Sequence, residues 1–171
     1  YHAHKFIAYF QNYTNTFLPL DRLLGYMEEA SKVEDIVEIS ISTRPDCIRQ
    51  DYLEAFYEFS SRTGIEVSIE LGLQTVNYHT LMEMNRGHGL AEFIDAVLRI
   101  APYHFPVCVH MILNLPGDTM DDAEESARIL STLPISMVKL HSLYIPKQCE
   151  LYDKYIRGEI EICPKEEYLN R

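Results

Sequence analysis

Apolar and polar residues alternate in several short, β-rich runs of this sequence, and this alternation limits the fold more than any other feature. Residues 37–42 read VEISIS, and residues 67–72 read VSIELG. The pattern recurs in VCVHMILN at 107–114 and, in part, in MVKLHSLY at 137–144. Because successive side chains of a strand point to opposite faces, each of these strands has one apolar and one polar face.

Helical patterns lie between the expected strands. We expect strands at 5–10, 36–42, 66–71, 107–113 and 137–144. Apolar residues at helical spacing predict intervening helices that include residues 20–27, 53–57, 93–101 and 123–130. Thr119 and Asp122 have the spacing of a capping box at the start of the last of these helices. The alternation predicts βα units with a parallel sheet, and residues 1–171 are expected to form a single domain.

A partial barrel accounts for the polar faces better than an open sheet does. Strands that helices cover on both faces read as nearly continuous apolar runs, which these strands do not. In a barrel the apolar faces lie under the helices and the polar faces surround a cavity. That cavity would contain Glu70, His110, Lys139 and His141 and would hold water or a polar ligand. The alternative is a buried pair, such as Glu70 with Lys139, that only satisfies its own charge.

The segments that follow the five strands are polar or contain Gly and Pro: QNYTNT, STRPDC, LQTVN, LPGDT and YIPK. In barrels of βα units these loops carry the catalytic groups. Pro116 and Gly117 predict a turn whose backbone N–H groups point toward the cavity mouth, near a helix N-terminus. Arg44 offers a forked donor for a carboxylate, although a surface pair with Asp46 explains it equally well.

The charge and the cysteines disfavour several classes of function. The formal charge is −11 and no run of Lys or Arg is present, which disfavours nucleic-acid binding by this segment alone. Cys47, Cys108, Cys149 and Cys163 match neither a metal knuckle nor a disulfide framework, so we expect reduced thiols. No apolar stretch of ~20 residues and no signal-peptide layout is found, which predicts a soluble cytoplasmic protein. A start without Met, close to a strand, indicates a segment of a longer protein.

Four motifs carry a family resemblance: STRPDC, ELGLQT with MNRGH shortly after it, HMILNLPGDT and KLHSLYIPK. In this order they resemble the radical S-adenosylmethionine (SAM) superfamily, in particular the branch of Elongator-type catalytic subunits and bacterial Fe-S oxidoreductases. The resemblance covers almost the whole chain. It implies an α/β fold, a partial TIM barrel, in which a [4Fe-4S] cluster cleaves SAM reductively to a 5'-deoxyadenosyl radical.

One element of the family pattern is absent from the sequence. The family holds its cluster with three cysteines spaced CxxxCxxC in the loop after the first strand, and no two cysteines here have either spacing. The resemblance therefore implies that this chain contains strands two to six with their flanking helices. The first βα unit and the cluster ligands would lie outside the chain, and the segment alone would be inactive.

The resemblance also implies which residues contact the cofactor. The candidates are Gln11, Asn12, Arg44, Glu70, Gln74, Arg86, Met111, Asn114 and Gly117, with Thr14 as an alternative in the first loop. Residues 11 and 12 stand where the family receives the methionine amino group, and Glu70 and Gln74 where it reaches the ribose or methionyl end. Arg44 and Arg86 would pair with the carboxylate. Residues 111–117 would pack along adenine, whereas His110, Lys139 and His141 would face the substrate.

The substrate, the catalytic residues and the roles of Arg86 and His88 cannot be read from the sequence. The resemblance implies a reductant such as flavodoxin or ferredoxin and allows tRNA as a substrate of a longer protein. No membrane partner is expected. Two other classes stay open: an inert barrel fragment that binds partners through its exposed sheet edges, and an aldolase- or lyase-like barrel with Lys139 as a Schiff-base amine.

Overall fold

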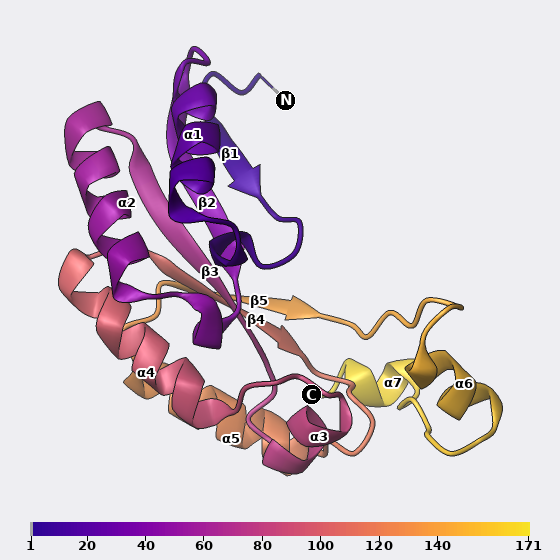
Figure 1. Cartoon of the computed structure of the whole chain (residues 1–171). Coiled ribbons are helices and arrows are strands. Elements are labelled where there is room, and N and C mark those ends of the chain that lie inside the picture. The colour runs from indigo at the N-terminus through magenta and orange to yellow at the C-terminus, as the bar shows by residue number, and fades with distance from the viewer. Residues whose placement is uncertain (1) are drawn as a thin grey trace.

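A curled sheet of five parallel strands forms the centre of the computed structural model, which describes residues 2–171 (Figure 1). The strands follow one another across the sheet in chain order. They are β1 (Phe6–Phe10), β2 (Ile36–Thr43), β3 (Glu66–Gln74), β4 (Val107–Ile112) and β5 (Met137–His141). The predicted βα order is confirmed, and the sheet curls into half of a barrel.

The four predicted helices lie along the outer face of this sheet (Figure 1). They are α1 (Leu20–Ser31), α2 (Gln50–Thr63), α4 (Leu90–Ile100) and α5 (Met120–Thr132). Their apolar sides meet the apolar strand faces in one core, to which Met27, Phe56, Phe93 and Leu130 contribute from the helices. The predicted capping box is present, because Asp122 Oδ2 accepts a hydrogen bond from the Thr119 backbone N–H at 2.7 Å.

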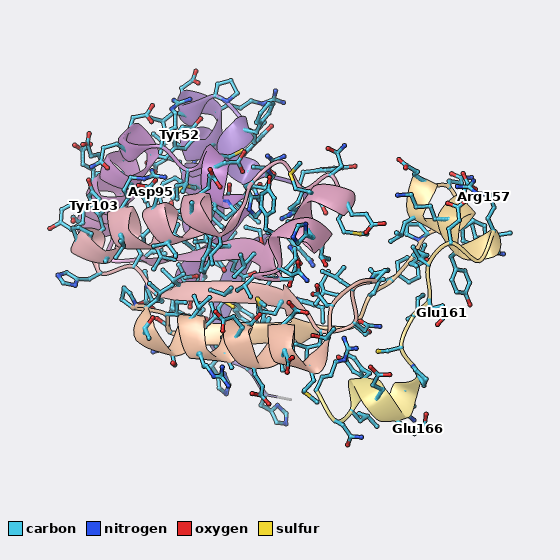
Figure 2. The ribbon with its side chains drawn as sticks, turned by 90° about the horizontal axis from the view of Figure 1, so that it is seen from below. Tyr52, Asp95, Tyr103, Arg157, Glu161 and Glu166 are labelled. Atoms are coloured by element: carbon cyan, nitrogen blue, oxygen red, sulfur yellow. The ribbon has the colours of Figure 1, made fainter. Side chains whose placement is uncertain are left out.

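Short elements complete the chain. They are the 3₁₀ turns η1 (Asn15–Phe17), η2 (Pro45–Cys47) and η3 (Ala101–Tyr103) and the helices α3 (Tyr78–Glu83), α6 (Glu150–Ile156) and α7 (Lys165–Tyr168). Figure 2 shows α6 and α7, with Arg157 and Glu166, at the end of the molecule away from Tyr52 and Tyr103. Arg171 ties the chain end back to β4 through a hydrogen bond to the Leu113 carbonyl, 2.9 Å long. Among the described helices, none is long and apolar enough to cross a membrane.

The ends of β3 and β5 differ from the prediction by three residues each, whereas the other strands differ by at most one. The expected fifth strand ends at His141 instead of continuing to 144, and the Leu143 N–H bonds the Asn114 side chain at 2.6 Å. The third strand is longer than expected, because Gly72 pairs with His110 and Gln74 with Met111, which leaves one extra residue between them. At this β-bulge Leu71 and Leu73 are both fully buried, and Gln74 has a φ of 78°.

Candidate functional site

The polar side chains of the strands gather on the inner, concave face of the sheet. There they line a groove of about 510 Å³, here called the lumen groove. Its lining comprises Tyr9, Gln11, Tyr13, Thr14, Ser42, Thr43, Arg44, Glu70, Gly72, Gln74, Arg86, His110, Lys139 and His141. A recess of about 950 Å³ beside the loop after β1 adjoins it and includes Asn12. The predicted polar cavity is therefore formed by residues from all five strands or their exits.

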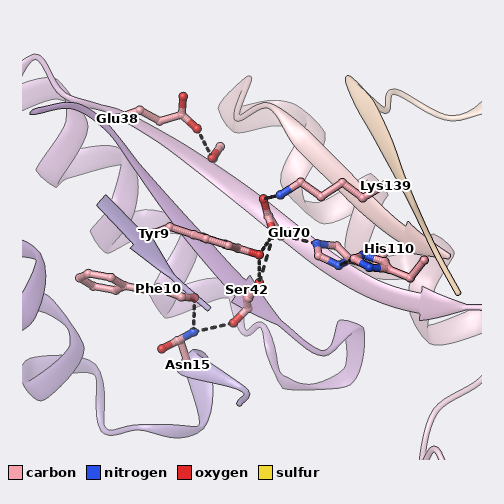
Figure 3. A network of polar contacts seen from close by, with 10 residues as sticks. Tyr9, Phe10, Asn15, Glu38, Ser42, Glu70, His110 and Lys139 are labelled. Carbon is pink, nitrogen blue, oxygen red and sulfur yellow. Dashed lines mark hydrogen bonds and ion pairs between the residues drawn. The ribbon is translucent and has the colours of Figure 1, made fainter. Parts of the chain in front are cut away.

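Glu70 lies at the centre of the polar network in the groove (Figure 3). Its Oε2 accepts hydrogen bonds from the Tyr9 hydroxyl at 2.5 Å and the Ser42 hydroxyl at 3.3 Å, and lies 2.7 Å from His110 Nε2. Its Oε1 accepts from the Lys139 ammonium. Burial alone would raise the pKa of Glu70, but hydrogen bonds from Lys139, Tyr9 and His110 lower that pKa to about 2. Glu70 is thus a buried, ionised carboxylate.

Two neighbours of Glu70 have protonation states that suit its negative charge: Lys139 is protonated and His110 is neutral. Burial lowers the pKa of Lys139, but its hydrogen bond to Glu70 outweighs burial and raises that pKa above its usual value. Burial lowers the pKa of His110 despite the attraction of Glu70, so its imidazole is neutral at pH 7. The predicted pair of Glu70 with Lys139 is present, but Tyr9 and two histidines join it.

Two arginines meet at the other end of the groove. Arg86 follows α3 and donates from Nη2 to the Gly72 carbonyl at 3.0 Å, whereas its Nε is buried without a partner among residues 2–171. Gly72 makes this possible, because a Cβ there would lie 2.5 Å from Arg86 Nη2. A Cβ at Gly87, where φ is 75°, would lie 2.9 Å from Arg44 Nη2. Both glycines therefore provide the space that a guanidinium group occupies.

At this end of the groove the positive charges of Arg44 and Arg86 are only partly balanced by Asp46. Arg44 forms a bidentate pair with Asp46, with distances of 2.9 and 2.6 Å, as the alternative interpretation of the sequence expected. Arg44 still lines the groove. Burial, and then the charge of Arg44, lower the pKa of Arg86. The buried His88 has an Nε2 without a partner among the described residues, and burial and the charge of Arg86 lower its pKa.

Besides Asn12, which lines only the adjoining recess, three predicted cofactor residues lie outside the lumen groove. Met111 is 2% exposed and lies in the core on the opposite face of the sheet. Asn114 uses its Oδ1 to accept a hydrogen bond from the Leu143 N–H at 2.6 Å. Gly117 has a φ of 92° in an exposed turn, where a Cβ would lie 3.3 Å from Thr80 Oγ1. Contacts of these residues with adenine, like the other assigned roles, stay predictions.

Tyr9, Ser42 and Gly72 belong to the site but were missed in the sequence. Ser42 and Gly72 occupy polar-face positions of β2 and β3, so the alternation could have revealed them. Tyr9 gave no such signal, because polar and apolar residues do not alternate in β1, which reads FIAYF.

One group of three potential metal-binding atoms occurs among the described residues, formed by Glu70, Cys108 and His110 within 4.8 Å of one another. The Lys139 ammonium already neutralises Glu70. Burial and the charge of Glu70 raise the pKa of the Cys108 thiol, which keeps it protonated. These contacts favour a closed hydrogen-bond network over a bound cation.

Known proteins share this sequence pattern. Residues 4–130 match the sequence model of the Radical SAM superfamily. The protein YtqA of Bacillus subtilis (strain 168) is 34% identical over 165 residues, which cover 96% of this chain and 51% of YtqA. A tRNA uridine(34) acetyltransferase of Methanocaldococcus infernus is 25% identical over 149 residues, 82% of this chain and 27% of that protein. The chain thus spans about half the length of YtqA.

A solved structure shares the fold. The archaeal Methanocaldococcus infernus Elp3 with an N-terminal deletion (1–46) has a TM-score of 0.79 at 21% identity, covering 96% of this chain and 43% of that one. The predicted partial barrel is therefore confirmed. Members of the superfamily use SAM and a [4Fe-4S] cluster. Because the superfamily model matches most of the sequence, the chain belongs to the radical SAM superfamily.

Proposed function

We propose that the lumen groove binds SAM and that Arg44 and Arg86 hold its methionyl carboxylate, within a SAM-cleaving radical enzyme. The buried Arg86 Nε without a partner, beside the second guanidinium of Arg44, is the observation that carries this proposal. An unpaired buried donor costs ~1–3 kcal/mol, which an arriving carboxylate would recover. A planar carboxylate fits the fork of a guanidinium.

Other residues of the groove suit the rest of SAM. Gln74 lies at the exit of β3, next to the bulge, and Gln11 and Thr14 lie on the loop after β1. These amide and hydroxyl groups offer uncharged donors and acceptors for the ribose and the amino group. Glu70 has both oxygens engaged by neighbours, so its part in this arrangement is to hold Lys139 and His110 in place.

The cluster does not fit the residues of this chain. The four cysteines are free, no two have CxxxCxxC spacing, and the one group of potential metal ligands in the described part contains a single thiol. A bound [4Fe-4S] cluster supplies the electron for reductive cleavage of SAM. The proposal is that the whole protein holds it with cysteines outside residues 1–171, and that flavodoxin or ferredoxin reduces it.

tRNA is one candidate substrate of the whole protein. The 25% identical relative is named as a tRNA uridine(34) acetyltransferase, which supports this class. The charge of −11 on this chain gives no basic surface for a phosphate backbone. Any binding of tRNA would therefore rely on other parts of the protein.

The Schiff-base alternative is disfavoured by the state of Lys139. A nucleophilic lysine needs a lowered pKa, whereas the hydrogen bond to Glu70 raises the pKa of Lys139. Borohydride trapping with a carbonyl substrate should accordingly leave Lys139 unmodified.

Calorimetric titration with SAM tests the binding site. Arg86→Gln and Arg44→Gln should each weaken binding at least about tenfold, because each removes a charge-assisted hydrogen bond. Arg128→Gln is the control, because this side chain is 70% exposed on α5 and should leave binding unchanged. Wild-type affinity in both groove variants would overturn the proposal.

The chemistry is tested separately with the whole protein. After anaerobic reconstitution with iron and sulfide and reduction with dithionite, it should release 5'-deoxyadenosine from SAM, detected by mass spectrometry. A reconstituted protein that binds SAM without forming this product would contradict the radical activity but not the binding site.

A further inference from the structure

The hydrogen bonds around Glu70 all run in one direction. An ionised carboxylate can only accept hydrogen bonds, so every neighbouring group must donate to it. His110 Nε2 lies 2.7 Å from Glu70 Oε2 and therefore carries a proton. Because burial keeps His110 neutral, its other nitrogen, Nδ1, has none.

This assignment determines the tautomer of a second histidine. His141 Nε2 lies 2.9 Å from His110 Nδ1, which can only accept, so His141 donates from Nε2. The ring centroids are 4.9 Å apart and the ring planes differ by 15°, which suits an in-plane hydrogen bond. A neutral His141 therefore has a bare Nδ1. His141 is exposed and lines the lumen groove.

We propose that His141 is an acid–base residue of the lumen groove, and that Glu70 and His110 are positioning residues that fix its tautomer. A substrate N–H or O–H bond breaks heterolytically, its electron pair stays on the substrate, and the proton binds His141 Nδ1. The imidazolium formed is stabilised through His110 by the charge of Glu70, as in other carboxylate–histidine pairs. No oxidant or reductant is needed. The role assumes that the groove is the reaction site and in this respect rests on the proposed function.

The other titratable groups around the groove leave this role to His141. They are Tyr9 from β1, Tyr13 after β1, Arg44 after β2, Glu70 from β3, Cys108 and His110 from β4, Lys139 from β5 and Arg86 after α3. Burial and the hydrogen bond to Glu70 raise the pKa of Tyr9, which keeps it a donor. Lys139 is held as an ammonium and both nitrogens of His110 are engaged.

The tautomers can be observed by NMR in the whole protein labelled with ¹⁵N-histidine, at a pH where both imidazoles are neutral. In wild type, the Nε2–H tautomer should exceed the other at least about tenfold for His110, whose acceptor is the charged Glu70, and for His141, because His110 Nδ1 can only accept. In Glu70→Gln this preference should be lost at both rings, since an amide both donates and accepts. Glu38→Gln, a half-buried acid on β2 bonded by Ser68, is the matched control and should keep the preference.

A second variant guards against misfolding of Glu70→Gln. His110→Leu keeps Tyr9, Ser42 and Lys139 as donors to Glu70 but has no acceptor for His141, so His141 should lose its preference. The proposal is overturned if wild-type His141 shows mixed tautomers, or if His110→Leu leaves its preference unchanged.

The reactivity of the bare nitrogen provides an independent readout. Diethyl pyrocarbonate acylates unprotonated imidazole nitrogens, and mass spectrometry reports the modified peptides. His141 should react faster than His110 in wild type, because both nitrogens of His110 are engaged, while the exposed His79 on α3 serves as internal reference. A His141 that reacts no faster than His110 would overturn the acid–base role. SAM titration of the variants above separates this failure from failure of the proposed function.

Discussion

A carboxylate that is only 5% exposed would normally become neutral, yet Glu70 stays ionised because donors surround both of its oxygens. The cost of burying its charge is offset by Lys139, whose ammonium also lies 4.8 Å from the ring centre of Tyr9. Removing one partner would leave another buried polar group unsatisfied. Each residue of this network therefore depends on the others.

The depressed pKa of Glu70 predicts a pH dependence of stability. Its folded-state pKa of about 2 lies below the ordinary value of 4.5, so the unfolded state binds the proton more readily. Ionised Glu70 therefore stabilises the fold fully above about pH 4.5, and this contribution is lost as the pH falls toward 2. Relative to Glu70→Gln, wild type should lose about 2–3 kcal/mol of unfolding free energy over this range. Urea titrations of wild type and Glu70→Gln at several pH values measure this loss, with Glu124→Gln as the surface control. A difference in unfolding free energy between wild type and Glu70→Gln that does not change with pH would contradict the prediction.

Gly72 predicts a second residue-scale effect. In Gly72→Ala the new Cβ would lie 2.5 Å from Arg86 Nη2 and 2.7 Å from Gln74 Nε2, so both side chains must move. SAM affinity should fall about as far as in Arg86→Gln, whereas stability should change by less than ~1 kcal/mol, because only flexible side-chain ends are displaced. Gly25→Ala on α1 is the control, since nothing lies within 4 Å of its Cβ position. It should stabilise the chain by ~0.5–1 kcal/mol without changing affinity, and loss of affinity in both variants would contradict the prediction.

Among the elements, α5 offers a test of a motif that was read from the sequence. Asp122→Ala removes the hydrogen bonds that Asp122 Oδ2 accepts from the Thr119 N–H and hydroxyl, at 2.7 and 2.8 Å. Unfolding free energy should fall by about 1 kcal/mol. Asp121→Ala, in the same turn but outside the capping box, should lose only ~0.3–0.5 kcal/mol of helix-dipole stabilisation. Equal losses in urea unfolding would show that the capping box adds nothing.

Helices and strands whose apolar residues recur with a clear period could be predicted from the sequence. Elements whose position depends on tertiary contacts could not. The alternation in β2 and β4 and the stripes of α1 and α4 determine one buried face, so their positions followed from the sequence. The six residues of α3 are too few to show a period.

The candidate site was predictable to a similar degree. Glu70 and His110 follow from the polar face of their strands, whereas the bulge at Leu73 depends on core packing that no local pattern reveals. The role of Arg86 depends on a contact with Gly72, fourteen positions earlier in the chain, that exists only in the folded structure.

At the scale of the molecule, the sheet leaves an apolar face open at β5. Val138 is 41% and Leu140 60% exposed, and both line a recess of about 480 Å³ between β5 and α5. The apolar side of β5 is thus less covered than those of the central strands. Exposed patches of this kind promote association.

Replacing Val138 and Leu140 together by Thr should reduce self-association at high concentration, measured by sedimentation, and should lower binding of a hydrophobic dye. The unfolding free energy should change by less than ~1 kcal/mol, because little burial is lost. Leu130→Thr, 8% exposed across the same recess, should cost ~2–4 kcal/mol. A large loss in the double variant would indicate that this face is covered in solution.

The glycines beside Arg86 and Arg44 have a consequence for comparing related sequences. Gly72 leaves the space that the Arg86 guanidinium fills, and Gly87 leaves the space beside the Arg44 guanidinium. The size of the residue at each glycine position is therefore matched to that of its arginine. A relative with a residue larger than glycine at position 72 would need a side chain shorter than arginine at position 86. In the same way, a larger residue at position 87 would require a shorter side chain at position 44. Loss of either glycine in a relative would then mark a protein in which the corresponding arginine has moved or is absent.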